Sequence, residues 1–211
     1  MIPIFWLGAV HMGRGEWDAG SRYLEEHLTI AKRTGDFRWL HAAQALLAER
    51  EILEGHAEAA RVRLEGVLDL PGLSEIDTVM VHVVLAWSCL ELRNEVWAEE
   101  LAGDAVRVAE ARENQRVLID ALRVEGMVLT RLRHPEQACR SFKRVLAMTD
   151  DATYPYPRAR ALYEYGMMLM PQGEKSQARA RLMEALGVFQ RLGARKDMER
   201  TQQALVLLDQ S

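Results

Sequence analysis

The sequence predicts an all-α fold, a right-handed α–α superhelix of about five helical hairpins that ends in a capping helix. Three observations predict it. Small residues recur at a fixed interval, larger apolar residues follow them at helical spacing, and a helix-ending signal recurs between them. No segment alternates apolar and polar residues in the manner of a strand, so we expect no sheet.

Small residues recur in two series whose successive steps are both 40, 38, 40 and 40 residues. A small side chain lets a neighbouring helix approach closely, so each series marks a helix–helix contact that is repeated along the chain. Self-similarity at such a period indicates a helical solenoid. The first series comprises Gly8, Ala48, Ala86, Gly126 and Gly166, and the second comprises Gly20, Ala60, Ala98, Ala138 and Ala178.

Larger apolar residues follow the second series at offsets of four and eight, which places all three positions on one helical face. Their members are Leu24, Leu64, Ala102, Phe142 and Leu182, then Leu28, Leu68, Val106, Leu146 and Leu186. Between the two series each unit has a break, at Gly15, Gly55, Arg93-Asn94, His134-Pro135 and Gly173. Glycine ends a helix in the left-handed conformation, and proline suits a first helical turn. Each unit is therefore expected to be helix A, a tight turn and helix B.

The expected repeats belong to one domain over residues 1–211. They cover residues 1–36, 37–74, 75–114, 115–154 and 155–193. The expected helices span 2–13, 16–34, 37–54, 57–69, 75–92, 95–112, 115–132, 135–148, 157–171 and 175–192. A capping helix at 194–208 carries polar residues on its outer side, as the end of a solenoid requires.

The first unit resembles the tetratricopeptide consensus, which has a Leu-Gly pair, a Gly-Asp-Tyr turn and then small, large and apolar residues in helix B. The matching residues are Leu7-Gly8, Gly15-Glu16-Trp17, Gly20, Leu24 and Leu28. The other four units match more loosely, and the third lacks the turn glycine. The period of about 40 exceeds the standard 34 residues, so the helices are expected to be longer than the family norm.

Longer repeats of this kind also resemble the helical arrays of large ATP-dependent bacterial transcription activators of the LuxR type, such as the maltose-regulon activator. The stretches ALRVEG at 121–126 and FQRLGAR at 189–195 are similar to their C-terminal arrays. The resemblance implies a sensor or scaffold segment. No Gly-Lys-Ser or Gly-Lys-Thr phosphate loop is present, and no helix-turn-helix domain separates from the array. The alternative is a stand-alone, peptide-sensing repeat protein.

Charge, cysteine content and hydropathy indicate which partners and which cellular setting the chain is suited to. The 27 basic and 31 acidic residues are mixed along the chain, so no basic cluster suited to nucleic acid is found. Two cysteines, Cys89 and Cys139, favour a reducing, cytoplasmic setting. The apolar stretch at 1–10 has no preceding basic residue, unlike a signal peptide, and is shorter than the roughly 20 residues of a membrane span. We expect no membrane association.

No catalytic, cofactor or metal site is expected, and the protein is predicted not to be an enzyme. The six histidines are never paired at three or four residues, the spacing that lets two ligands on a helix meet one metal ion. Cys89 and Cys139 are interpreted as packing residues, because no base is found near either. Glu125 occupies an expected core position and is expected to pair with an arginine such as Arg158 or Arg160.

A groove lined by the A helices is the predicted binding site. In this repeat class those helices line the concave face, and the expected lining combines methionine, which adapts to varied partners, with aromatic anchors and a few charges. The predicted groove residues are Glu49, Met80, Trp87, Arg123, Met127, Arg160, Tyr163 and Met167.

The expected partner of this groove is a protein segment, a peptide or a small effector, and other domains of the same polypeptide are a further possibility. A homodimer through the apolar N-terminal end is also considered. Two alternatives stay open. In the first alternative, the side chains of the groove pack on one another and close it. In the second, the groove is the active site of an enzyme, built on Glu49, Asp120, Arg123 and Arg160.

Overall fold

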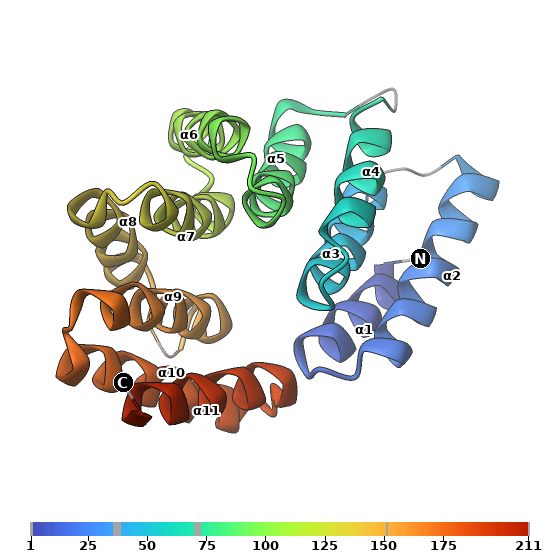
Figure 1. The fold of residues 1–211 in the computed structure, drawn as a ribbon. Helices are drawn as coiled ribbons and strands as arrows, with labels where there is room; N and C mark the ends of the chain where they lie inside the picture. Colours follow the sequence, from blue (N-terminus) through green and yellow to red (C-terminus); the bar gives the residue numbers. More distant parts are fainter. Residues whose placement is uncertain (1, 36–38, 70–72, 151, 211) are drawn as a thin grey trace. The chain divides into compact units, whose positions relative to one another are not determined.

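A computed structural model describes residues 2–35, 39–69, 73–150 and 152–210 (Figure 1). Over these residues the chain consists of α-helices joined by short turns, with one 3₁₀ segment and no strand. The helices pack as successive hairpins, which confirms the predicted all-α solenoid class. The chain divides into two compact units, residues 1–117 and residues 118–211.

The first unit contains three hairpins. Its helices are α1 (Ile2–Gly13), α2 (Trp17–Thr34), α3 (Leu40–Leu53), α4 (Ala57–Leu68), α5 (Glu75–Glu91) and α6 (Glu95–Ala111). Helix α1 packs on α2, α3 on α4 and α5 on α6, while α3 and α4 both also contact α5. The first residues of α7 (Gln115–Arg131) complete this unit.

The second unit continues with the rest of α7. It contains α8 (Pro135–Met148), α9 (Pro155–Leu169), the 3₁₀ helix η1 (Met170–Gln172), α10 (Lys175–Leu192) and α11 (Arg195–Gln210). Helix α9 packs on both α8 and α10, and α11 packs on α10. The expectation of one domain over the whole chain stays a prediction.

The first small-residue series lies where the two helices of a hairpin meet. A Cβ atom added at Gly8 would lie 2.8 Å from the Leu24 side chain, and one at Gly126 would lie 2.7 Å from the Phe142 ring. At Gly166 the nearest atom would be Leu182 Cγ, at 2.8 Å. These distances are below ordinary carbon–carbon contact, so a larger residue at any of these three positions would clash with the B helix.

The tight turns share one backbone pattern with or without glycine. Gly15 has φ 73°, and Arg93 takes the same left-handed conformation at φ 63°. In both turns the next amide reaches back five residues, from Glu16 to the His11 carbonyl and from Asn94 to the Cys89 carbonyl, each at 2.9 Å. The hydrogen bonds therefore form the turn, and glycine only removes its local strain.

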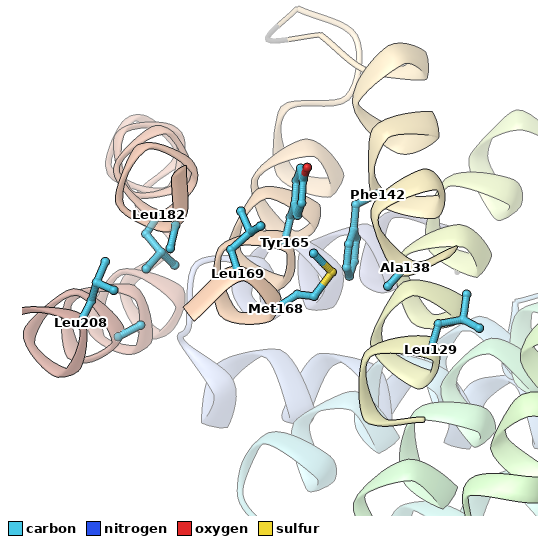
Figure 2. Close-up of a cluster of buried hydrophobic side chains, with 10 residues drawn as sticks. Leu129, Ala138, Phe142, Tyr165, Met168, Leu169, Leu182 and Leu208 are labelled. Carbon is cyan, nitrogen blue, oxygen red and sulfur yellow. The ribbon is translucent and has the colours of Figure 1, made fainter. Parts of the chain in front are cut away.

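The core of the second unit lies around α9 (Figure 2). Tyr165 stacks on Phe142 of α8 with ring centroids 5.6 Å apart. On the other side of α9, Leu182 of α10 and Leu208 of α11 belong to the same buried cluster. Burial of Leu208 shows that α11 is packed on the array, as expected of a capping helix.

Several helix boundaries differ from the sequence expectation, most of them by a single residue. Helix α9 begins at Pro155 rather than at 157, because proline is favoured in the first turn. It ends at Leu169 rather than at 171, because Pro171 cannot donate an amide hydrogen bond to continue the helix and lies in η1. Helix α3 begins at Leu40, and the expected start at 37 lies outside the described residues. None of the described helices has the length and apolar character of a membrane span.

Candidate functional site

Five of the predicted groove residues belong to the second unit, on helices α7 and α9, and side chains of α11 lie beside those of α9. We call this surface the ladder face, because ion pairs and ring contacts link the three helices in succession. It comprises Asp120, Met127, Tyr156, Arg160, Tyr163, Met167, Asp197 and Arg200.

Arg160 links α9 to α7. Its Nη1 atom lies 4.0 Å from Oδ1 of Asp120, and its guanidinium lies 5.7 Å from the ring centroid of Tyr156. Planar stacking on an aromatic ring together with an ion pair holds an arginine side chain in one orientation. Arg160 is therefore positioned before any partner arrives.

Arg200 links α11 to α9 in the same manner. Its guanidinium lies 4.8 Å from the centroid of Tyr163, and its Nη1 atom lies 3.8 Å from Oδ1 of Asp197. The other oxygen of Asp197 accepts a hydrogen bond from the hydroxyl of Tyr156 at 3.0 Å. Burial raises the pKa of Tyr163, and the nearby Arg200 opposes that shift only in part. Tyr163 therefore stays a neutral hydroxyl at physiological pH.

Arg123 lies beneath this surface rather than on it. Only 1% of the residue is exposed. Its Nη1 atom donates to the sulfur of Met127 at 3.3 Å, and its Nε atom lies 3.5 Å from Oδ1 of Asp120. The prediction that Arg123 presents an exposed charge to a partner is wrong, because its guanidinium is buried and contacts the side chains of Met127 and Asp120.

Methionines supply the apolar part of the ladder face. Met127 and Met167 are partly buried and pack against the cluster around Phe142 and Tyr165. Thioether side chains are flexible and polarisable, so they adapt to partners of different shape. The face thus combines fixed charged and aromatic groups with adaptable apolar ones.

The predicted residues of the first unit behave differently. Trp87 is only 3% exposed, so its prediction as a solvent-accessible docking residue is wrong. Residues Val83 to Leu90 of α5 are all buried, and α5 packs on α3, α4 and α6. A helix that is apolar on all sides is a core helix. Met80 and Glu49 are partly exposed, and Met80 packs against the cluster around Phe5. A continuous strip from Met80 to Met167 stays a prediction.

Two expectations about single residues have clear outcomes. Glu125 accepts a hydrogen bond from Ser141 at 2.6 Å. Arg158, one of its expected partners, instead pairs with Glu184 at 2.8 Å. Cys89 is buried, and desolvation raises its pKa to about 11, which leaves a protonated, unreactive thiol.

Sequence reasoning missed three members of the ladder face, namely Tyr156, Asp197 and Arg200. Asp197 and Arg200 were overlooked because α11 was interpreted only as a cap. A signal was present, since Asp120, Arg160 and Arg200 are spaced by 40 residues, the period of the array. No group of three or more His, Cys, Asp or Glu side chains arranged as metal ligands is found in the described parts of the chain.

Neither a scan against protein-family models nor a search of curated proteins finds a match. Solved structures of similar fold are found. BtubC (BKLC) from P. vanneervenii has a TM-score of 0.60 at 17% identity, over 95% of this chain and 83% of that one. Aspartyl phosphate phosphatase F from Bacillus subtilis has a TM-score of 0.63 at 14% identity, over 97% of this chain and 54% of that one.

A third similar structure is a Rap protein complexed with Competence and Sporulation Factor. Its TM-score is 0.62 at 14% identity, over 98% of this chain and 62% of that one. At these identities the likeness concerns the fold alone, and it supports the helical-repeat architecture. The chain spans 54% of the length of aspartyl phosphate phosphatase F and 62% of that of the Rap protein.

Proposed function

We propose that this protein is a binding module that takes a protein segment or peptide on the ladder face of its second unit. One observation carries the proposal. Three helices far apart in sequence present arginine, tyrosine and methionine side chains, and the charged ones are already held in place. Arginine and tyrosine are enriched among residues that dominate binding energy. Side chains fixed before binding lose less entropy when a partner arrives.

The chemistry of the face suits an amphipathic peptide better than a strongly charged one. Arg160 and Arg200 are each matched by an aspartate, so the surface has little uncompensated charge. Met127 and Met167 offer apolar contact beside them. A short segment with apolar side chains and backbone groups free to hydrogen-bond would satisfy both kinds of surface.

A fold neighbour supports this direction. The Rap protein structure contains a second molecule, Competence and Sporulation Factor, bound to a protein of the same architecture. Helical solenoids present extended surfaces for such partners. We propose binding rather than catalysis, because the face holds ion pairs and stacked rings and the pKa of Tyr163 is moved away from neutral pH.

The finer context is also a proposal. The resemblance of the repeats to the arrays of ATP-dependent transcription activators supports a sensor or scaffold role in a bacterial transcription regulator in the cytoplasm. Reading the coding sequence on both sides of this segment tests it. Flanking ATPase and DNA-binding regions are the expected result, and their absence would favour a stand-alone peptide sensor.

Peptide display followed by calorimetry tests the binding role. We expect a random peptide library to yield ligands whose affinity falls at least tenfold in Arg160→Ala and in Tyr163→Ala. Arg107→Ala, on the exposed side of α6, is the matched control and should bind normally. Selected peptides that bind both ladder variants as tightly as the parent would contradict the proposal.

A further inference from the structure

A recess of about 850 Å³ lies in the first unit, away from the ladder face. Residues of α3 and α4 line it, together with Lys32 of α2. Along α4 it extends from Glu58 to Val67, about 14 Å at 1.5 Å per residue. The recess is therefore elongated and runs along a helix.

The α4 wall of this recess departs from the chain's own repeat pattern. In α4 the member of the second small-residue series is Ala60, and the residues two and six positions after it are Val62 and Gly66. Val62 is 58% exposed, and a Cβ added at Gly66 would meet nothing within 4 Å. In the other four B helices the same two positions carry at least one charge: Arg22 and Glu26, Glu100 and Asp104, Arg140 and Arg144, and Ala180 and Glu184. At these two positions α4 alone lacks a charged residue, and the charges of its wall lie at Glu58 and Arg63 instead.

The polar groups of the recess are satisfied except at its rim. Arg63 binds both carboxylate oxygens of Glu51 and donates to Gln44 at 2.7 Å. Lys32, on the α2 side, is exposed and makes no ion pair with any residue that the structure describes. An occupant is therefore expected to be apolar along the α4 wall and to carry a carboxylate near Lys32.

The size of the recess favours a helix as its occupant. A helix with its side chains is 10–12 Å across, so two turns occupy on the order of 1,000 Å³. The recess is slightly smaller than that volume, as it would be if a helix were partly inserted between two others. Docking of an amphipathic helix in a groove is a recurrent mode of protein recognition.

Helix α11 has the matching features. It packs on α10, but Val206 and Leu207 on another side are 55% and 56% exposed. With Glu199 they line a shallow recess of about 540 Å³ on the α11 surface. Residues 199, 206 and 207 share one helical face. This face is apolar at one end and carries the Glu199 carboxylate two turns away, where Lys196 pairs with it at 3.1 Å on the exposed surface. Its apolar end complements Val62, and its carboxylate complements Lys32.

We propose that the recess between α2 and α4 binds α11 of a second copy of this chain. The contact is heterologous, because two different surfaces meet, so it joins copies head to tail. In this contact Val206 and Leu207 cover Val62 and the space beside Gly66, and Glu199 pairs with Lys32. The contact uses no side chain of the ladder face, although Arg200 lies two turns before Leu207 on the same side of α11.

Sedimentation equilibrium of the full chain and its variants tests the contact. The expected mass rises above the 24.0 kDa monomer as concentration increases. Gly66→Trp places a large side chain in the recess at a position where an added Cβ meets nothing within 4 Å, and Leu207→Glu charges the α11 face. Each variant alone is expected to associate at least tenfold more weakly. Met183→Glu, an equally exposed apolar site on α10, is the control and should associate like the parent.

Mixing the two variants gives the decisive result. Gly66→Trp keeps an intact α11, and Leu207→Glu keeps an intact recess, so the mixture should form a heterodimer and grow no further. Circular dichroism confirms that each variant is folded, and Val62→Glu replaces Gly66→Trp if it is not. A parent that stays monomeric up to about 1 mM, the weak end of specific association, overturns the proposal. So does a mixture that stays monomeric.

Discussion

Helices α5 and α9 occupy the same place in the repeat, yet α5 is buried continuously from Val83 to Leu90 and α9 presents a polar, aromatic side. Met80, Val83 and Trp87 of α5 correspond in the repeat to Arg160, Tyr163 and Met167 of α9. Trp87 is buried, whereas all three residues of α9 are partly exposed. The position of a residue in the repeat therefore predicts which side of its helix it lies on. The polarity of the side chains on that side then decides whether it is buried or exposed.

The largest expected difference between the two helices is in stability. Trp87→Ala should lower the free energy of unfolding by about 3–5 kcal/mol, because it leaves a cavity in a close-packed core. Met167→Ala should cost clearly less, because its side chain is partly exposed. Urea denaturation of both variants measures the difference, and equal costs would erase the distinction between α5 and α9.

A second comparison concerns glycines inside helices. Gly126→Ala should cost about 1–3 kcal/mol, because its Cβ would lie 2.7 Å from the Phe142 ring. Gly66→Ala should instead stabilise the protein by about 0.5–1 kcal/mol, since its Cβ meets open space and alanine favours a helix. Thermal unfolding of the pair checks both signs. Destabilisation by both substitutions would contradict the packing described for α4.

The third prediction is that the stability of the first unit depends more strongly on pH than that of the second unit. Burial lowers the pKa of His41 in α3 and of His82 in α5, both in the first unit. The folded state then binds fewer protons than the unfolded state below the ordinary histidine pKa of about 6.5. The stabilising contribution is present above pH 6.5 and is lost as the pH falls through the lower folded value.

Hydrogen exchange of the two units at several pH values measures this effect. Amides of α3 and α5 should lose protection as the pH falls below about 6.5, and those of α9 and α10 should change less. His82→Gln should reduce the pH dependence of the first unit, while His56→Gln, at an exposed site, should not. An equal loss of protection in both units would show that these histidines are not responsible.

The smallest expected effect concerns the turn after α5. Arg93→Gly should stabilise the protein by up to about 1 kcal/mol, because a non-glycine residue at φ 63° is strained. The same substitution at Arg107, inside α6, should destabilise by a similar amount. Chemical denaturation distinguishes them, and a destabilising Arg93→Gly would mean that the arginine side chain contributes more than the backbone strain.

Most of the fold was predictable from sequence because the repeat leaves local signals. The spacing of Gly8, Gly126 and Gly166 identified hairpin contacts that the structure contains. Turn positions without glycine, such as Arg93, were identified only from their spacing relative to the small-residue series. The end of α9 was missed, since the effect of Pro171 was overlooked.

The candidate site was predictable only in part. Period and polarity together pointed to Met127, Arg160, Tyr163 and Met167, which lie on α7 and α9 and are all partly exposed, and their role as a binding surface stays a proposal. Burial of Trp87 depends on how many helices pack around α5, which the position of one residue in its own helix does not reveal. The apolar run from Val83 to Leu90 was nevertheless a usable signal of a core helix.

Methyl NMR tests the central claim, that the second unit's ladder face is the binding surface, most directly. Methionine methyl groups are labelled in the parent chain, and a display-selected peptide is added. The account predicts shifts for Met127 and Met167, with Met80 of α5 and Met12 of α1 unchanged. Shifts confined to Met80 or Met12, with Met127 and Met167 unmoved at saturation, would contradict it.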